Sequence, residues 1–131
     1  MTNFLAATLF GSMISFMILI SPIVFTVLSA NDAKNFLRKF FPRLFIFGMI
    51  LSSLLIVFTL RELDLFNQKL SAIIFLGFFI NLFFITPKVN KYRDLEMSNV
   101  KNAKKIFSIL HSVSVCIFVI QLILSLVIIF N

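Results

Sequence analysis

The apolar stretches of this chain contain few side chains that could bind a ligand or exchange a proton. The most reactive is the imidazole of His111, the single histidine, because it titrates near neutral pH. At about 1.5 Å of rise per helical residue, Ser21, Asn81 and His111 all fall roughly 7 to 10 Å from the same end of their stretches. Together with Pro22 and Ser114 they predict a polar layer that holds a small ligand or a proton. The alternative is that His111 only hydrogen-bonds Asn81 and is structural.

Pro22 adds a backbone feature to this polar layer. A proline inside a helix has no N–H for the carbonyl four residues earlier, here that of Ile18, and so it kinks the helix. The kink predicts a carbonyl that needs another donor at the level of Ser21. A packing adjustment without function is the alternative.

Other chemistry has little support in the residue types. No His, Cys or acidic residues have metal-ligand spacing, no glycine-rich loop could hold a phosphate, and bis-histidine haem would need a second histidine. We therefore expect no cofactor, no metal and no catalytic residue. An accessory or scaffold membrane protein ranks first among the functions considered. Small-solute or ion permeation by an oligomer ranks second, and a haem- or quinone-linked enzyme a distant third.

The composition predicts that these residues are carried by membrane-spanning helices. Hydrophobic residues make up 60% of the 131 residues and charged residues 13%, and the mean hydropathy is +1.08. Uncharged apolar stretches of about the length that crosses a bilayer occur four times, and lipid forces such stretches to be helical. The fold expected is an all-α integral membrane domain over residues 1–131. It is a four-helix bundle with spans near 4–28, 42–60, 65–86 and 106–130.

The basic residues predict the orientation of these spans. Ten of the twelve lie in two segments on one side, residues 29–43 and 87–105, so the positive-inside rule places those segments in the cytoplasm and both termini outside. We expect a bacterial inner membrane, with anionic headgroups as the partner of the basic loops and no binding of nucleic acid. A homo-oligomer or another membrane protein is a further expected partner. The ten residues are Lys34, Arg38, Lys39, Arg43, Lys88, Lys91, Arg93, Lys101, Lys104 and Lys105.

The first basic segment has an amphipathic pattern. Apolar residues recur at helical spacing from Ala33 to Leu44, and Lys34, Arg38 and Lys39 face away from them. This pattern predicts a short helix lying in the membrane interface between spans one and two.

Small and polar residues four positions apart predict where the helices touch. Lipid solvates Leu and Phe as well as a neighbouring helix does, so close approach of backbones or interhelical hydrogen bonds must hold the bundle together. Each stretch offers one such pair. The pairs are Gly11 with Ser15, Gly48 with Ser52, Gly77 with Asn81, and Ser108 with Ser112.

Several short motifs, in order along nearly the whole chain, give a resemblance to one family. They are Gly11 to Leu28 with its Ser-Pro-Ile-Val-Phe core, Phe40-Phe41-Pro42, Thr86-Pro87 followed by Asn90 to Asp94, and the segment from Phe107 to Ser114. Together they resemble the transmembrane protein 205-like family, a domain of unknown function. The resemblance implies a four-helix membrane domain without an established reaction. It highlights Pro42, Pro87, Arg93, His111 and Ser114. Many relatives have His and Trp near the start of helix one, where this chain has Asn3 and Phe4.

Overall fold

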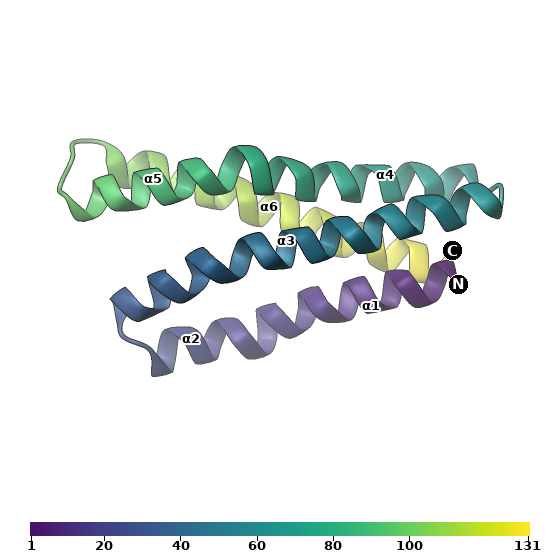
Figure 1. Cartoon of the computed structure of the whole chain (residues 1–131), viewed down its shortest axis with the longest axis horizontal. Coiled ribbons are helices and arrows are strands. Elements are labelled where there is room, and N and C mark those ends of the chain that lie inside the picture. Colours follow the sequence, from purple (N-terminus) through teal and green to yellow (C-terminus); the bar gives the residue numbers. More distant parts are fainter.

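The protein is built from helices alone (Figure 1). The computed structural model describes all residues from 1 to 131, and it contains no strand. The elements are α1 (Thr2–Ser15), the π-helical segment η1 (Phe16–Ile20), α2 (Ser21–Val27), α3 (Ala30–Arg61), α4 (Leu65–Ile80), the π-helical segment η2 (Asn81–Ile85), α5 (Thr86–Met97) and α6 (Ala103–Phe130).

These elements join into four long rods. Each rod is long enough and apolar enough to cross a membrane: Thr2–Val27, Ala30–Arg61, Leu65–Met97 and Ala103–Phe130. An all-helical solution follows from the apolar composition, because a helix pairs its backbone groups within one segment and lipid offers none of its own. The predicted class, an all-α protein with four helices fit to span a membrane, is confirmed.

The four rods run up and down around a common axis. Helix α3 packs on α1 and on α4, while α6 closes the ring by packing on α1, α4 and α5. Both chain ends lie at one end of the bundle, beside the turn between α3 and α4 (Figure 1). The opposite end carries the other two turns. We call it the basic end, because it holds the ten basic residues predicted to lie on one side.

Short polar turns connect the rods. The Asp64 carboxylate accepts a hydrogen bond from the backbone N–H of Asn67 at 3.0 Å and caps α4, and Ser29 Oγ accepts from the N–H of Asp32 at 3.2 Å and caps α3. Asn99 and Asn102 take the left-handed backbone conformation in the turn before α6, which asparagine tolerates well. The turns are therefore set by local sequence.

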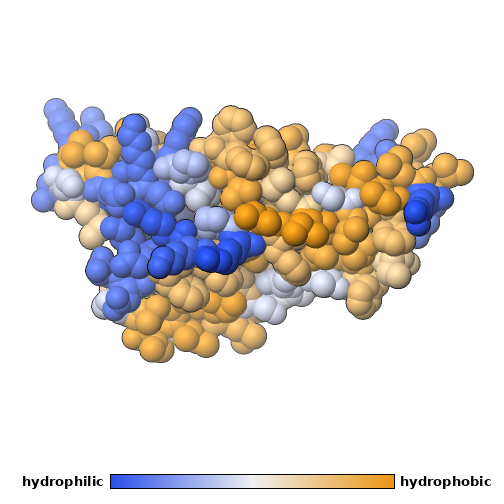
Figure 2. Space-filling view, viewed as in Figure 1, coloured by the Kyte–Doolittle hydropathy of each residue, from blue (hydrophilic) through white to orange (hydrophobic).

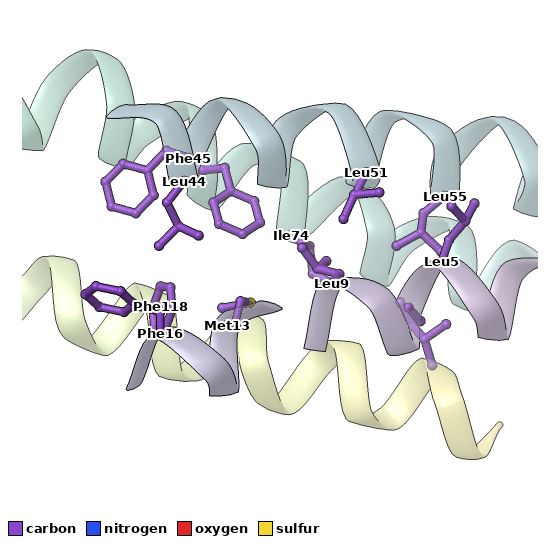
Figure 3. Close-up of a cluster of buried hydrophobic side chains, with 13 residues drawn as sticks. Leu5, Leu9, Met13, Phe16, Leu44, Phe45, Leu51, Leu55, Ile74 and Phe118 are labelled. Atoms are coloured by element: carbon purple, nitrogen blue, oxygen red, sulfur yellow. The ribbon is translucent and has the colours of Figure 1, made fainter. Parts of the chain in front are cut away.

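The core fills the axis with apolar side chains from all four rods (Figure 3). Toward the chain ends it consists of leucines and isoleucines, such as Leu9, Leu55, Ile74 and Ile128, which are completely buried. Toward the basic end it becomes aromatic. There the ring of Phe16 stacks on Phe40 and meets Phe41 and Phe118 edge-on, with centroids 5.2 to 6.3 Å apart.

The segment expected to form a separate interfacial helix does not do so. Residues 30–41 are the first turns of α3, which continues through Pro42 without a break to Arg61. The apolar face of these turns packs on the protein, because Leu37, Phe40 and Phe41 lie against the aromatic part of the core. The amphipathic pattern therefore marks a buried face and an exposed face of a long helix, not a helix lying on the bilayer.

The small residues predicted to form the contacts between helices have different surroundings in the structure. Gly48 lies directly under the ring of Phe78, since a Cβ built there would come within 2.5 Å of it, and a Cβ on Gly77 would come within 2.8 Å of Gln121. Gly11 is exposed with nothing within 4 Å, so it lies in no seam. Ser15, Ser108 and Ser112 are also exposed on the outer faces of their helices. Close packing thus depends on the glycines of α3 and α4, where the bulky ring and amide need room.

We predict opposite effects of alanine at two glycines. Gly48→Ala should lower the stability of the bundle by about 1–3 kcal/mol, because Phe78 is fully buried and cannot move aside. Gly11→Ala should leave stability unchanged or raise it by up to about 1 kcal/mol through helix propensity. Thermal unfolding in mild detergent, followed by circular dichroism, measures both. Equal effects of the two substitutions would contradict the packing at Gly48.

Candidate ligand-binding cavity

Two π-helical segments adapt the backbone to prolines in the first and third rods. Pro22 and Pro87 lie at the second position after η1 and η2. Just before each proline the backbone N–H of Ser21 reaches back five residues to the Phe16 carbonyl, and that of Thr86 reaches back to the Asn81 carbonyl. The wider turn absorbs the missing N–H of the proline. Such turns are rare and occur often at functional sites.

A cavity of about 230 Å³ lies beside both π segments, toward the basic end. All four rods contribute to its wall. Its apolar lining consists of Phe16, Met17, Phe25, Leu37, Phe41, Phe45, Val89, Val115 and Phe118. No charged side chain is among the lining residues.

Five polar side chains also line this cavity. Ser21 begins α2, Thr86 and Asn90 come from α5, and His111 and Ser114 come from α6. The structure thus brings together three predicted site residues, Ser21, His111 and Ser114. None of the five side chains makes a hydrogen bond within the chain.

The hydroxyl groups of the cavity differ from those elsewhere in the bundle. Ser21, Thr86 and Ser114 are half-buried, and each of them donates to nothing. Every other buried or half-buried serine or threonine hydroxyl does donate. Thr2 donates to Glu62, and five more donate to a carbonyl three or four residues earlier at 2.7 to 2.9 Å: Ser12, Ser52, Thr59, Ser71 and Ser125. Among the buried and half-buried serine and threonine hydroxyls, the three in the cavity are therefore the ones left free for a bound molecule.

His111 is held at the edge of the cavity by stacking. Its ring lies nearly parallel to that of Phe107, with 5.8 Å between centroids and 9° between planes. The guanidinium of Arg93 lies 4.4 Å from the centroid of the same Phe107 ring and also contacts Glu96 at 3.5 Å. This stack fixes the plane of the imidazole without using either ring nitrogen.

The expected pair of His111 and Asn81 does not form. The antiparallel register is set where Gly77 meets Gln121, whose Nε2 donates to the Ile74 carbonyl at 2.8 Å. From that level His111 lies ten positions toward the basic end, about 15 Å, whereas Asn81 lies only four positions away, about 6 Å. The prediction was wrong because it measured depth from the ends of the apolar stretches. Both helices in fact continue beyond those ends.

Asn81 instead lies alone in the interior. It is fully buried at the start of η2, and neither its Nδ2 nor its Oδ1 has a hydrogen-bond partner. Pro22, also predicted as part of the site, is exposed and does not line the cavity. The residues that sequence reasoning missed are Thr86 and Asn90. In Ser21-Pro22 and Thr86-Pro87 a hydroxyl residue precedes a proline, and this shared pattern could have indicated that Thr86 lies at the site as Ser21 does.

The basic segments are mainly helical and partly tied to the bundle. Apart from Lys101, which lies in the turn before α6, the basic residues expected in loops lie on α3, α5 and α6. Arg38 Nη2 contacts the Asp94 carboxylate at 2.7 Å and donates to the Asn90 carbonyl at 3.2 Å, and Lys34 Nζ lies 3.2 Å from Asp94. Asp94 lies outside the apolar stretches. The hydrogen bond from Arg38, and then that from Lys34, holds the pKa of its carboxyl below the usual range.

A family model described as a domain of unknown function, DUF4149, matches residues 4–98. This range is well over half of the chain. The chain belongs to the DUF4149 family. The matched range contains Ser21, Thr86 and Asn90, whereas His111 and Ser114 lie beyond it on α6.

The DUF4149 description assigns no activity and does not carry the transmembrane protein 205-like name. No curated protein and no solved structure matches the chain.

We predict that Asn81→Leu raises stability. Leucine has the same branched shape and removes two buried polar atoms without partners, each of which costs about 1–3 kcal/mol when left unpaired. The midpoint of thermal unfolding in detergent should increase. A large decrease would mean that the Asn81 amide has a partner in the membrane-embedded protein.

Proposed function

We propose that the protein is a non-catalytic accessory membrane protein that holds a small membrane-soluble molecule in the cavity at its basic end. One observation carries this proposal. The three half-buried serine and threonine hydroxyls that make no hydrogen bond all line the same cavity, together with the unpaired side chains of Asn90 and His111. Polar groups at membrane depth are costly unless they are paired, and a bound molecule would pair them.

The arrangement of the rods supports entry from the bilayer. Helix α2 packs only on η1 and α3 and makes no contact with α5 or α6. Figure 1 shows α2 splayed away from α5 at the basic end. The side of the cavity between α2 and α6 therefore faces the region of the acyl chains, and a molecule dissolved in the membrane reaches it without crossing water.

The opposite half of the bundle argues against a pore through a single chain. There the axis is filled by Leu9, Leu55, Ile74 and Ile128, all completely buried. The buried hydroxyls Ser52 and Thr59 donate to their own helix and leave no polar path. Binding thus fits the geometry better than permeation does.

We further propose that the basic end faces the cytoplasm and contacts anionic headgroups. Hydrophilic residues gather at this end of the molecule (Figure 2). Only Lys34, Arg38 and Arg93 are paired with acids. Seven basic residues remain without an ion pair: Lys39, Arg43, Lys88, Lys91, Lys101, Lys104 and Lys105. Such residues are attracted to anionic lipid by about 1 kcal/mol each near the surface.

The resemblance to the transmembrane protein 205-like family is also kept as a proposal of common descent. It depends on the Ser-Pro and Thr-Pro motifs that begin α2 and α5, on Phe40-Phe41-Pro42, and on the segment from Phe107 to Ser114. Each of these motifs contributes to the cavity wall, which includes Ser21, Phe41, Thr86, His111 and Ser114.

The orientation predicts which turns an impermeant thiol reagent reaches from outside intact cells. In a Cys116→Ser background, Leu63→Cys in the exposed turn between α3 and α4 should be labelled, and Ser98→Cys after α5 should not. Permeabilised cells should label both. Labelling of Ser98→Cys alone in intact cells would reverse the orientation.

The binding proposal predicts that a small molecule copurifies with the protein. Native mass spectrometry of the full chain, released from mild detergent, should detect a bound small molecule in the wild type. Ser114→Phe should lose it, because the new ring fills the cavity. The matched control is Ser112→Phe, two positions away on the same helix but exposed on its outer face, and it should keep the molecule. A wild type that carries no small molecule, and that no added amphiphile stabilises, would refute the binding function.

A further inference from the structure

The size of the cavity restricts the part of a ligand that it can hold. An apolar cavity of about 150 Å³ is enough for one benzene ring, and complete small-molecule sites measure about 300–1,000 Å³. The cavity here, at about 230 Å³, lies between these limits. It has room for a single substituted ring or a group of that size, and the rest of the molecule has to lie outside.

The chemistry of the wall restricts the charge of that group. No acidic or basic side chain lines the cavity, so nothing there compensates a charge taken out of water. The side chains of Ser21, Thr86, Ser114, Asn90 and His111 can each donate a hydrogen bond and also accept one. A group that fits this wall is therefore uncharged and polar, and carbonyl or hydroxyl oxygens can pair with these side chains.

Aromatic side chains determine the shape that fits between these donors. Phe16, Phe41 and Phe118 line the cavity, where Phe16 meets each of the other two edge-on, and Phe45 stacks on Phe41 with 5.7 Å between centroids. Rings in such a cluster pack best against a further flat ring. The plane of His111, fixed by its stack on Phe107, adds another flat surface at the edge.

We infer that the cavity receives one uncharged six-membered ring with carbonyl or hydroxyl oxygens, the head of a quinone-type amphiphile. This inference rests on the proposed binding function and gives its ligand class. The free hydroxyls and the Asn90 amide donate to the ring oxygens. The apolar tail leaves between α2 and α6, where the two helices do not touch, and stays among the acyl chains.

The test compares three probes with the same decyl tail on the purified full chain in detergent. They are a decyl benzoquinone, decylbenzene, which lacks the oxygens, and a decyl monoacylglycerol, which lacks the ring. The dissociation constant comes from the rise in unfolding temperature with probe concentration. We expect the benzoquinone to bind on the order of tenfold more tightly than either of the others, because it alone has both features.

Two kinds of variant assign this binding to the cavity. Ser114→Phe should abolish the benzoquinone shift, and Ser112→Phe should retain it. The triple variant Ser21→Ala, Thr86→Val, Ser114→Ala changes little volume, so it should fold. It should bind the benzoquinone on the order of tenfold more weakly while its affinity for decylbenzene stays the same.

The outcomes separate the ligand class from the binding function. Equal affinity for benzoquinone and decylbenzene would show that the ring oxygens contribute nothing to binding. If the monoacylglycerol binds most tightly, the cavity does not prefer a ring. Either result leaves the cavity as a binding site. If no probe binds but the wild type still carries a copurified molecule, the ring class is wrong and the binding function stands. If no probe binds and no small molecule copurifies, both the proposed ligand class and the binding function are refuted.

Discussion

The pairing of backbone groups in a medium without water is the constraint on which the rest of this structure depends. Long uninterrupted helices satisfy it nearly everywhere. Pro22 and Pro87 break the pattern because they bring no N–H into the first and third rods. The π turns of η1 and η2 repair the pattern locally. The same repair widens each rod beside the cavity, where Ser21 and Thr86 lie unpaired.

The end of the bundle with the chain termini and the basic end pack differently, because the π turns lie toward the basic end. At the end with the chain termini, small residues such as Gly48 and Ser52 let the rods approach closely, and aliphatic side chains fill the axis. At the basic end α2 diverges from α5 (Figure 1), and aromatic rings pack beside it. The ion pair of Arg38 with Asp94 connects α3 to α5 there, while α2 has no such connection. The cavity lies between α2 and the pair of helices α3 and α5, which the ion pair connects.

The sequence predicted the fold class well because hydropathy and length act along single helices. It placed Ser21, His111 and Ser114 in one layer, and all three line the cavity. The pairing of His111 with Asn81 failed because it depends on the register between two helices, which Gly77 and Gln121 set through tertiary contact. Likewise, the pattern of residues 33–44 shows that one face is apolar. It does not show whether that face meets lipid or, as here, Phe16.

The two halves of the chain repeat one plan. Each is a hairpin whose first helix contains a π segment, a hydroxyl residue and a proline in that order, and whose second helix is an uninterrupted α-helix through the membrane region. The first helices of the two hairpins both run toward the basic end (Figure 1). Ser21 and Thr86 occupy matching places in the two hairpins, each between a π segment and a proline, and both line the cavity. The second helices do not match in this way, because α6 adds His111 and Ser114 to the wall whereas α3 adds only Leu37, Phe41 and Phe45. One plan used twice therefore gives a cavity with one polar side and one apolar side.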